Sequence, residues 1–313
     1  MSSPRRIAVI GHRGWASSAI LGALAASSAS VKVLHQADSD VSGVPPQVTT
    51  TLVDFADVPA LVEALRDIDI VISLVGPPGV EKQQALVKAI PQTNVQLFSP
   101  SDLAARYDGQ GLSIPVNKAK LEVENAARSA CIPITIVLPG NFAEFALSTP
   151  AMGIDLENNK LIHTIDSDKQ SLNVCTRSYV AAAYVSIFAE TPISQLKDRV
   201  IGLSELTFSG DDLAQALHAR HGRFPTLFRH SREKVDSEIE AALTQGSPFS
   251  LPWYCRKIWG TGQQRTMIGQ DIWEVQDFPK ASLESLVTQG HVESYRELPS
   301  FVQEYFRSTF VDG

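Results

Sequence analysis

The sequence predicts an α/β protein built on a parallel sheet that helices cover on both faces. Apolar runs typical of strands alternate with segments of helical spacing at intervals of roughly 20–30 residues as far as Leu138. The run 68–75 is almost wholly apolar, which is typical of a parallel strand buried on both faces. The apolar run 6–10 breaks into a glycine turn and continues as an alanine-rich helical segment. These observations predict a Rossmann-like, doubly wound sheet with a smaller, discontinuous C-terminal domain.

Spacing and turn residues define the individual elements. Glycine and proline punctuate the polar segment 37–46, and residues 76–79 form a second turn of small residues. Ser209-Gly210-Asp211-Asp212 opens a capped helix that ends at Gly222. The predicted strands cover 6–10, 31–36, 48–53, 68–75, 95–98, 132–138, 160–165 and 203–208, and the predicted helices cover 18–24, 59–66, 81–90, 177–189 and 213–221.

Composition and charge argue against several classes of protein. The 313 residues are 44% hydrophobic, enough to bury a large core, and the net charge of -7 argues against a nucleic-acid surface. No apolar run approaches the ~18 residues of a membrane span, and the N-terminus passes directly into a strand without a signal peptide. Cys131, Cys175 and Cys255 lack metal-site spacing and suit a reducing compartment. We therefore expect a cytoplasmic monomer or homodimer that binds a small molecule and no metal.

The turn Gly11-His12-Arg13-Gly14 lies between the first strand and the first helix. A dinucleotide pyrophosphate binds at such a helix N-terminus, although many strand-to-helix turns need glycine only for a positive φ. The motif is G-x-x-G, and Ser17 stands at the third glycine position. The later strand and helix signals favour cofactor binding. The predicted contacts in these turns are Gly11, Arg13, Gly14, Trp15, Gly76 and Pro77.

The end of the second strand indicates which dinucleotide would bind. NAD enzymes tend to place an acid here for the ribose 2'-hydroxyl, whereas this chain has His35 and Gln36. Arg13 could donate to a 2'-phosphate, or it could be a solvated turn residue. We include His35 among the predicted cofactor contacts, and the pattern favours NADP over NAD.

Three motifs carry a family resemblance. Phe98-Ser99-Pro100-Ser101-Asp102, the helical segment Lys120-Leu121-Glu122-Val123-Glu124, and Ile132-Pro133-Ile134-Thr135-Ile136-Val137-Leu138-Pro139-Gly140-Asn141-Phe142 resemble the NmrA-like and isoflavone-reductase-like branch of the atypical short-chain dehydrogenases. The similarity spans roughly the first 200 residues in order, and the tail looks like that of fungal-type members. The resemblance implies a Rossmann-like reductase that binds NAD(P).

Lys120 is the candidate catalytic residue. Standard short-chain dehydrogenases use Tyr-x-x-x-Lys, but no tyrosine of this chain has a lysine four residues on, and Val116 holds the tyrosine position relative to Lys120. The resemblance implies that Lys120 matches the helix lysine proposed to bind the nicotinamide ribose or to assist proton transfer. The alternative is a surface lysine that pairs with Glu124 at i, i+4.

The predicted substrate contacts follow the fifth and sixth strands. Ser99 and Ser101 could hydrogen-bond the carboxamide of the cofactor or a substrate carbonyl, or they could cap the following turn. We assign Ser99 to the cofactor and Ser101 to the substrate. Asn141, Phe142 and Phe145 are expected to line the mouth of the pocket.

The C-terminal half adds a histidine and a group of aromatic residues. His163 lies in a predicted strand, where a lone histidine is more often structural than catalytic. Trp253, Tyr254, Trp259 and Trp273 are interleaved with glycines, which suggests a loop over an apolar ligand. These rings could equally cover a satellite core or form a dimer contact. Trp253 and Tyr254 are included as predicted substrate contacts.

These interpretations give a domain division and three functional hypotheses. A cofactor domain covers 1–150, with 175–205 returning to it, and a substrate domain covers 151–174 and 206–313. The leading hypothesis is an NADP-dependent reductase of a small aromatic or polycyclic natural product, with Lys120 aiding protonation after hydride transfer. The missing tyrosine also fits a redox sensor that binds NAD(P) without turnover. A non-redox cyclase or isomerase is the third hypothesis, since fold alone does not separate them.

Overall fold

The computed structural model describes residues 4–313, which form two compact units. The first unit contains residues 4–103, 115–138 and 180–201. The second contains Ala104–Ile114, Pro139–Tyr179 and Gly202–Gly313. The predicted division assigns 104–114 and 139–150 to the first domain, whereas these segments belong to the second compact unit. No helix within residues 4–313 is long and apolar enough to cross a membrane.

The first unit is built on a five-stranded parallel sheet, which confirms the predicted fold class. The strand order is β3-β2-β1-β4-β5, so the order reverses between β1 and β4, where open α/β sheets bind ligands. The elements are β1 (Arg6–Ile10), α1 (Trp15–Ala26), β2 (Ser30–His35), β3 (Thr49–Leu52), α2 (Val58–Ala64), β4 (Ile70–Ser73), η1 (Pro77–Gly79), α3 (Gln83–Ala89), η2 (Ile90–Gln92), β5 (Leu97–Ser99), α5 (Pro115–Ser129), β6 (Thr135–Leu138), α7 (Arg177–Tyr184), η4 (Val185–Glu190), η5 (Ile193–Gln195) and β11 (Arg199–Leu203).

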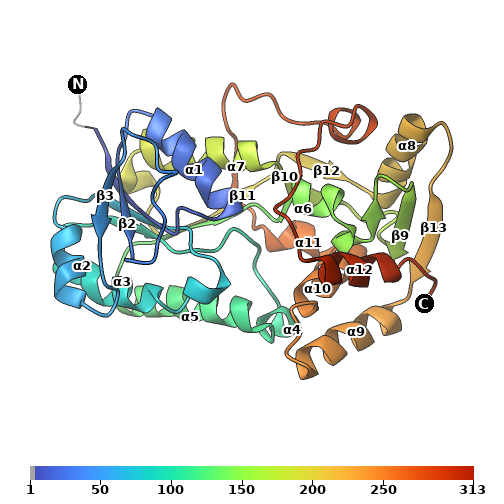
Figure 1. The fold of residues 1–313 in the computed structure, drawn as a ribbon, viewed down its shortest axis with the longest axis horizontal. Coiled ribbons are helices and arrows are strands. Elements are labelled where there is room, and N and C mark those ends of the chain that lie inside the picture. The colour runs from blue at the N-terminus through green and yellow to red at the C-terminus, as the bar shows by residue number, and fades with distance from the viewer. Residues whose placement is uncertain (1–3) are drawn as a thin grey trace. The chain divides into compact units, whose positions relative to one another are not determined.

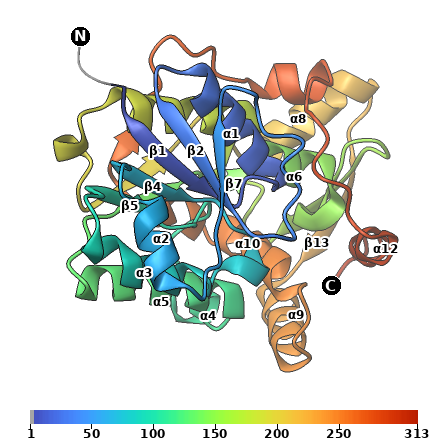
Figure 2. The same cartoon turned by 60° about the vertical axis from the view of Figure 1, so that its left-hand side comes forward.

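Helices cover both faces of this sheet because its strands are apolar on both sides. Ala8 and Ile10 of β1 belong to a buried cluster with Val71 of β4 and Phe98 of β5. The helices α2, α3 and α5 lie on this face, and α1 lies on the other with α7 (Figure 1). The turned view in Figure 2 shows β1, β2, β4 and β5 side by side. The continuous apolarity of the strands is therefore explained by two helical layers.

Gly11 allows the turn after β1 to approach the end of β4. Its φ is +85°, and a Cβ placed on it would lie 2.6 Å from the backbone nitrogen of Val75. Ser17 stands at the third motif position and donates its hydroxyl to the carbonyl of Leu74 at 2.9 Å. A side chain at position 11 would push these segments apart, so glycine is required there.

The second unit contains two small three-stranded sheets and a separate apolar core. The sheets have the orders β12-β10-β7 and β13-β9-β8, and Leu213, Trp259 and Leu286 belong to the core. The elements are α4 (Gly109–Leu112), β7 (Asn141–Phe142), α6 (Ala143–Ser148), η3 (Pro150–Met152), β8 (Ile154–Asp155), β9 (Lys160–Thr164), β10 (Leu172–Cys175), β12 (Leu206–Phe208), α8 (Gly210–His221), β13 (Thr226–His230), α9 (Arg232–Thr244), α10 (Ser250–Gly260), α11 (Gln263–Met267), β14 (Ile272–Trp273), η6 (Glu284–Thr288) and α12 (Ser300–Ser308).

The prediction of one strand over 203–208 is wrong. The segment is divided between β11 and β12, which belong to different sheets. Glu205 lies between them, and its buried carboxylate accepts hydrogen bonds from the backbone amides of Thr176 and Ala281 at 2.6 and 3.0 Å. These bonds hold the chain in a bend rather than a strand. The predicted capped helix is confirmed, since Ser209 and Asp212 form a capping box and Gly222 ends α8.

We predict that Gly11→Ala destabilises the protein by at least about 2 kcal/mol, because it combines a positive φ with a backbone clash. Gly43→Ala is the control, since Gly43 is exposed and a Cβ there meets nothing within 4 Å. That variant should stay within about 0.5 kcal/mol of the parent. Urea denaturation measures both values. Equal losses in the two variants would contradict the close approach.

Candidate cofactor and catalytic site

The first unit contains a cleft at the carboxyl edge of its sheet. Its volume is about 260 Å³. The helix α1 points its N-terminus here, and Gly14 provides no side-chain cap, nor does the first turn contain an acidic residue. The free backbone amides of such a turn favour an anion. The lining residues are Ile10, Gly11, His12, Arg13, Gly14, Leu34, His35, Gln36, Ser39, Phe55, Val75, Gly76, Pro78, Gly79, Lys82, Gln83 and Leu86.

The charges that line this cleft are positive. Arg13 and Lys82 are both exposed, and Lys82 Nζ donates to the side-chain oxygen of Gln36 at 2.7 Å. None of the described lining residues is acidic. Asp40 lies outside the lining but within electrostatic reach of Arg13, whose charge helps to lower the pKa of Asp40 after the larger effect of hydrogen bonds from Ser42. The cleft can therefore accept a polyanion near the end of β2.

The structure brings most of the predicted cofactor residues together. Gly11, Arg13, Gly14, His35 and Gly76 all line the cleft. Trp15 is half-buried in the first turn of α1 and Pro77 is exposed, and neither lines it. The neighbouring Pro78 takes the place predicted for Pro77.

Lys82 was missed by sequence reasoning. It immediately precedes α3, after the turn at the end of β4. The sequence contained one signal for Lys82, namely a cation that directly follows a turn of small residues at the carboxyl edge of the sheet. Its approach to Gln36, which is 46 residues away in sequence, depends on the pairing of strands.

Lys120 lies on α5 beside the turn after β5. Its Nζ donates to the backbone carbonyl of Asp102 at 2.5 Å and lies 3.9 Å from the Asp102 carboxylate. Burial lowers the pKa of Lys120, and the charge of Asp102 opposes that effect. Glu124, the predicted surface partner, is instead bound by Arg128 at 3.1 Å. The helix therefore does not form the alternative surface pair between Lys120 and Glu124.

The two serines after β5 have different roles. Ser101 is buried, donates its hydroxyl to the Val75 carbonyl at 2.6 Å, and donates its backbone amide to the side-chain oxygen of Gln83 at 2.8 Å. These bonds tie the turn after β5 to the turn after β4. Ser99 is buried beside Tyr184, whose pKa is raised by burial and by the charge of Asp102, and lowered by its contact with Ser99. Sequence reasoning missed Tyr184, because it is separated from Lys120 by more than 60 residues.

The predicted substrate residues after β6 belong to the second unit. Asn141 and Phe142 form β7, and Phe145 lies on α6, where its ring packs edge-on against Tyr295 at 5.5 Å. The side-chain nitrogen of Asn141 is buried and has no hydrogen-bond partner among residues 4–313. That nitrogen is available to donate to a ligand.

The prediction of a ligand-facing loop around Trp253 and Tyr254 is wrong, because the segment forms helix α10, and the alternative that these rings cover a satellite core is confirmed. Both rings are fully buried. Trp253 Nε1 donates to the hydroxyl of Tyr305 at 2.8 Å, and the Tyr254 hydroxyl donates to Asp108 at 2.8 Å. The guanidinium of Arg256 stacks over Trp253 at 4.5 Å from the ring centroid. These contacts place the rings in the interior of the second unit and leave neither a surface for a ligand.

Glu144 is a buried carboxyl next to the predicted substrate residues. Only 2% of the residue is exposed, and its carboxylate accepts from the backbone amide of Arg177 at 2.8 Å. Burial raises the pKa of Glu144 to about 7, despite that hydrogen bond. The group therefore changes charge near neutral pH.

The sheet order and the cleft define a Rossmann-like α/β protein with a cleft at the switch point of its sheet. Residues 3–241 match the model of the NmrA-like family, and the chain belongs to that family. The resemblance to the NmrA-like family stated from the sequence motifs is confirmed, and the fungal-type tail stays a prediction.

Individual relatives agree with this family. The chain is 30% identical over 212 residues to an isoflavone reductase homolog of Zea mays, covering 65% of this chain and 66% of that protein, a little under two thirds of its length. A leucoanthocyanidin reductase–NADPH complex from Vitis vinifera has a TM-score of 0.74 at 14% identity, covering 91% of this chain and 98% of its own. A structure titled AtPrR2 with NADP⁺ and (+)pinoresinol has a TM-score of 0.74 at 15% identity, covering 92% and 99%. These two structures share the fold.

We predict that Glu144→Gln removes a pH-dependent loss of stability. Between the ordinary value of 4.5 and the folded pKa of about 7, folded Glu144 keeps a proton that the unfolded chain releases, so the free energy of unfolding falls as pH rises. The variant should gain on the parent between about pH 5 and pH 8, by up to about 3 kcal/mol.

Denaturant titrations at several pH values measure this gain. Glu157→Gln is the control, because Glu157 is an exposed glutamate of the same unit. The prediction would be contradicted if the free energies of unfolding of the Glu144 variant and the parent changed in parallel across this pH range.

Proposed function

We propose that this protein is an NADP-dependent reductase of a small aromatic or polycyclic substrate, acting on a C=O, C=N or C=C bond. The observation that carries the proposal is the cleft of the first unit. The cleft combines the N-terminus of α1, which has no side-chain cap, with the cations Arg13 and Lys82. None of its described lining residues is acidic. This donor set fits the pyrophosphate and 2'-phosphate of NADP better than it fits NAD.

The relatives support the same activity. The Zea mays protein is named an isoflavone reductase homolog, and the two structures cited above were determined with NADPH and with NADP⁺. The substrate named in one of them, (+)pinoresinol, is the basis for proposing an aromatic natural product. We assign the cofactor to the first unit and the substrate contacts Asn141, Phe142 and Phe145 to the second. We also propose that the protein acts in the cytoplasm.

Different residues of the chain would bind different parts of the cofactor. The amides at the start of α1 would hold the pyrophosphate, and Gly11 and Gly14 leave room for it. Arg13 and Lys82 would bind the 2'-phosphate as charge-assisted donors. When bound, NADPH supplies the hydride. Ser99, the last residue of β5, would receive the nicotinamide carboxamide.

Lys120 would supply the proton. Its Nζ is held by the carbonyl of Asp102, and burial makes its charged form less stable. A lysine with a lowered pKa releases a proton to a reduced substrate more readily, directly or through water. The Asp102 carboxylate at 3.9 Å partly opposes this lowering of the Lys120 pKa.

We predict that Arg13→Ala and Lys82→Ala each weaken NADPH binding more than NADH binding. Each variant loses a charge-assisted contact to the 2'-phosphate, so the Kd for NADPH should rise about tenfold or more while that for NADH changes by about twofold or less. Calorimetry with Lys88→Ala as the control measures this, because Lys88 is exposed on α3 and does not line the cleft. Equal losses for both dinucleotides would contradict a 2'-phosphate site here.

We predict that Lys120→Met abolishes most turnover. With ketone, imine and enone substrates, the rate of NADPH oxidation should fall about 10²- to 10⁴-fold, the usual contribution of a general acid. Lys118→Met is the matched control, since Lys118 is exposed on the same helix and pairs with Glu122. Full activity of the Lys120 variant would contradict its role. Tight NADPH binding without oxidation by any substrate would favour the redox sensor, and product formed without NADPH oxidation would favour the cyclase or isomerase.

A further inference from the structure

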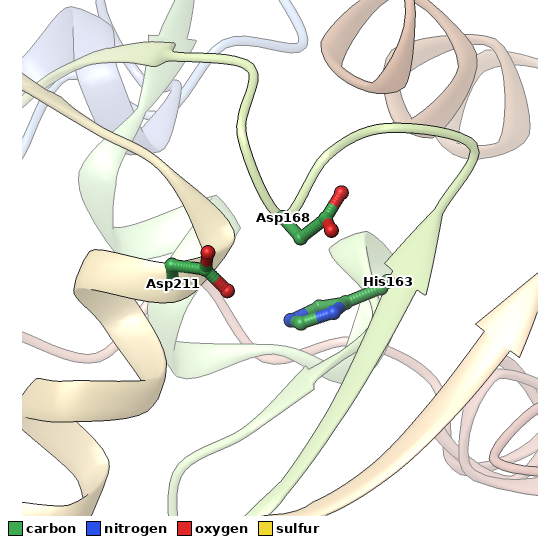
Figure 3. Close-up of side chains that lie close together, drawn as sticks. All are labelled: His163, Asp168 and Asp211. Atoms are coloured by element: carbon green, nitrogen blue, oxygen red, sulfur yellow. The ribbon is translucent and has the colours of Figure 1, made fainter.

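Three side chains that can bind a metal ion gather in the second unit. They are His163 at the end of β9, Asp168 in the turn after it, and Asp211 in the first turn of α8. One ligand atom from each residue lies within 4.8 Å of the others. Figure 3 shows the His163 ring extending from its strand into the space beside the two carboxyl groups.

The backbone holds these three positions together. The amide of Gly210 donates to the carbonyl of Ser167 at 2.8 Å, and the amide of Asp211 donates to the carbonyl of Asp168 at 2.9 Å. A Cβ on Gly210 would lie 2.8 Å from the Ser167 carbonyl oxygen, so this contact requires glycine. The start of α8 is therefore fixed against the turn that contains Asp168.

His163 is a buried polar group that lacks a partner. Only 3% of the residue is exposed, and neither ring nitrogen makes a hydrogen bond to any group within residues 4–313. Burying an imidazole without a partner is unfavourable, and a metal ion would satisfy one nitrogen.

The charges around His163 favour a cation overall. Asp168 and Asp211 are two negative groups that act on the ring, and Arg229 is one positive group. Arg229 lies opposite His163 in the pairing of β13 with β9, and it opposes the two carboxylates. Asp211 is exposed, so an ion can enter from solvent on that side.

We propose that His163, Asp168 and Asp211 form a zinc-type site for a divalent transition metal ion, completed by water. Imidazole nitrogen with two carboxylate oxygens suits Zn²⁺, whereas Mg²⁺ and Ca²⁺ prefer oxygen ligands alone. Tetrahedral bonds of about 2.0–2.2 Å put ligand atoms roughly 3.4 Å apart, so the three side chains would move closer together on binding. The ion would link β9, its turn and α8, and would stabilise the second unit. The spacing 163, 168, 211 matches no metal motif, which explains why the sequence predicted no metal.

The test is a titration of the chelator-treated full chain with Zn²⁺, followed by calorimetry and by thermal unfolding. The parent should bind one equivalent and unfold at a higher temperature with Zn²⁺ than without, because an ion that binds the folded state stabilises it. Mg²⁺ at the same concentration should have no effect. Co²⁺ should give a visible absorption spectrum that Zn²⁺ displaces.

Variants connect the binding to these residues. Because Asp211 is exposed, the Asp211→Asn variant should keep the fold while its zinc affinity falls about tenfold or more. Asp166→Asn is the matched control, an exposed aspartate in the same turn that is outside the cluster, and should bind zinc like the parent. His163→Gln tests the third ligand and should also lose affinity. Failure of the parent to bind zinc, or equal affinity in the Asp211 and Asp166 variants, would overturn the proposal; neither measurement depends on NADPH.

Discussion

The first unit depends on the close approach between the turn after β1 and the backbone at the end of β4. The amide of Leu74 donates to the Ile10 carbonyl at 2.7 Å, and Gly11 leaves no side chain in the way. Ser17 then ties α1 to the same carbonyl end of β4. As a result the N-terminus of α1 lies where the strand order reverses, beside the cleft. A larger residue at position 11 would move both the helix and the cleft.

Two lysines of the first unit are placed in opposite electrostatic settings. Lys82 is exposed at the edge of the cleft, where its Nζ donates to the side chain of Gln36. Lys120 is largely buried against Asp102, where desolvation makes its proton easier to lose. In the proposed function, the same residue type would therefore serve cofactor binding in the first setting and proton transfer in the second. Tyr184, also buried near Asp102, adds a hydroxyl to the second setting from a distant part of the chain.

Local patterns predicted the first unit well, because long apolar runs and glycine turns report directly on buried parallel strands. The strands and helices as far as β6 were placed within a few residues. Errors arose where distant contacts decide the structure. One of two interpretations made the aromatic residues before Gly260 a loop, but they are the buried face of α10, and Gly260 is the last residue of that helix. Lys82 and the group His163, Asp168 and Asp211 are assembled by strand and helix pairing, which spacing does not reveal.

The most direct test of the central claim is a crystal structure of the protein with NADP⁺. The pyrophosphate should lie at the first turn of α1, beside Gly11 and Gly14, and the 2'-phosphate should lie within hydrogen-bonding distance of Arg13 or Lys82. Dinucleotide bound outside this cleft, or none bound at saturating concentration, would contradict the assignment of the first unit as an NADP site.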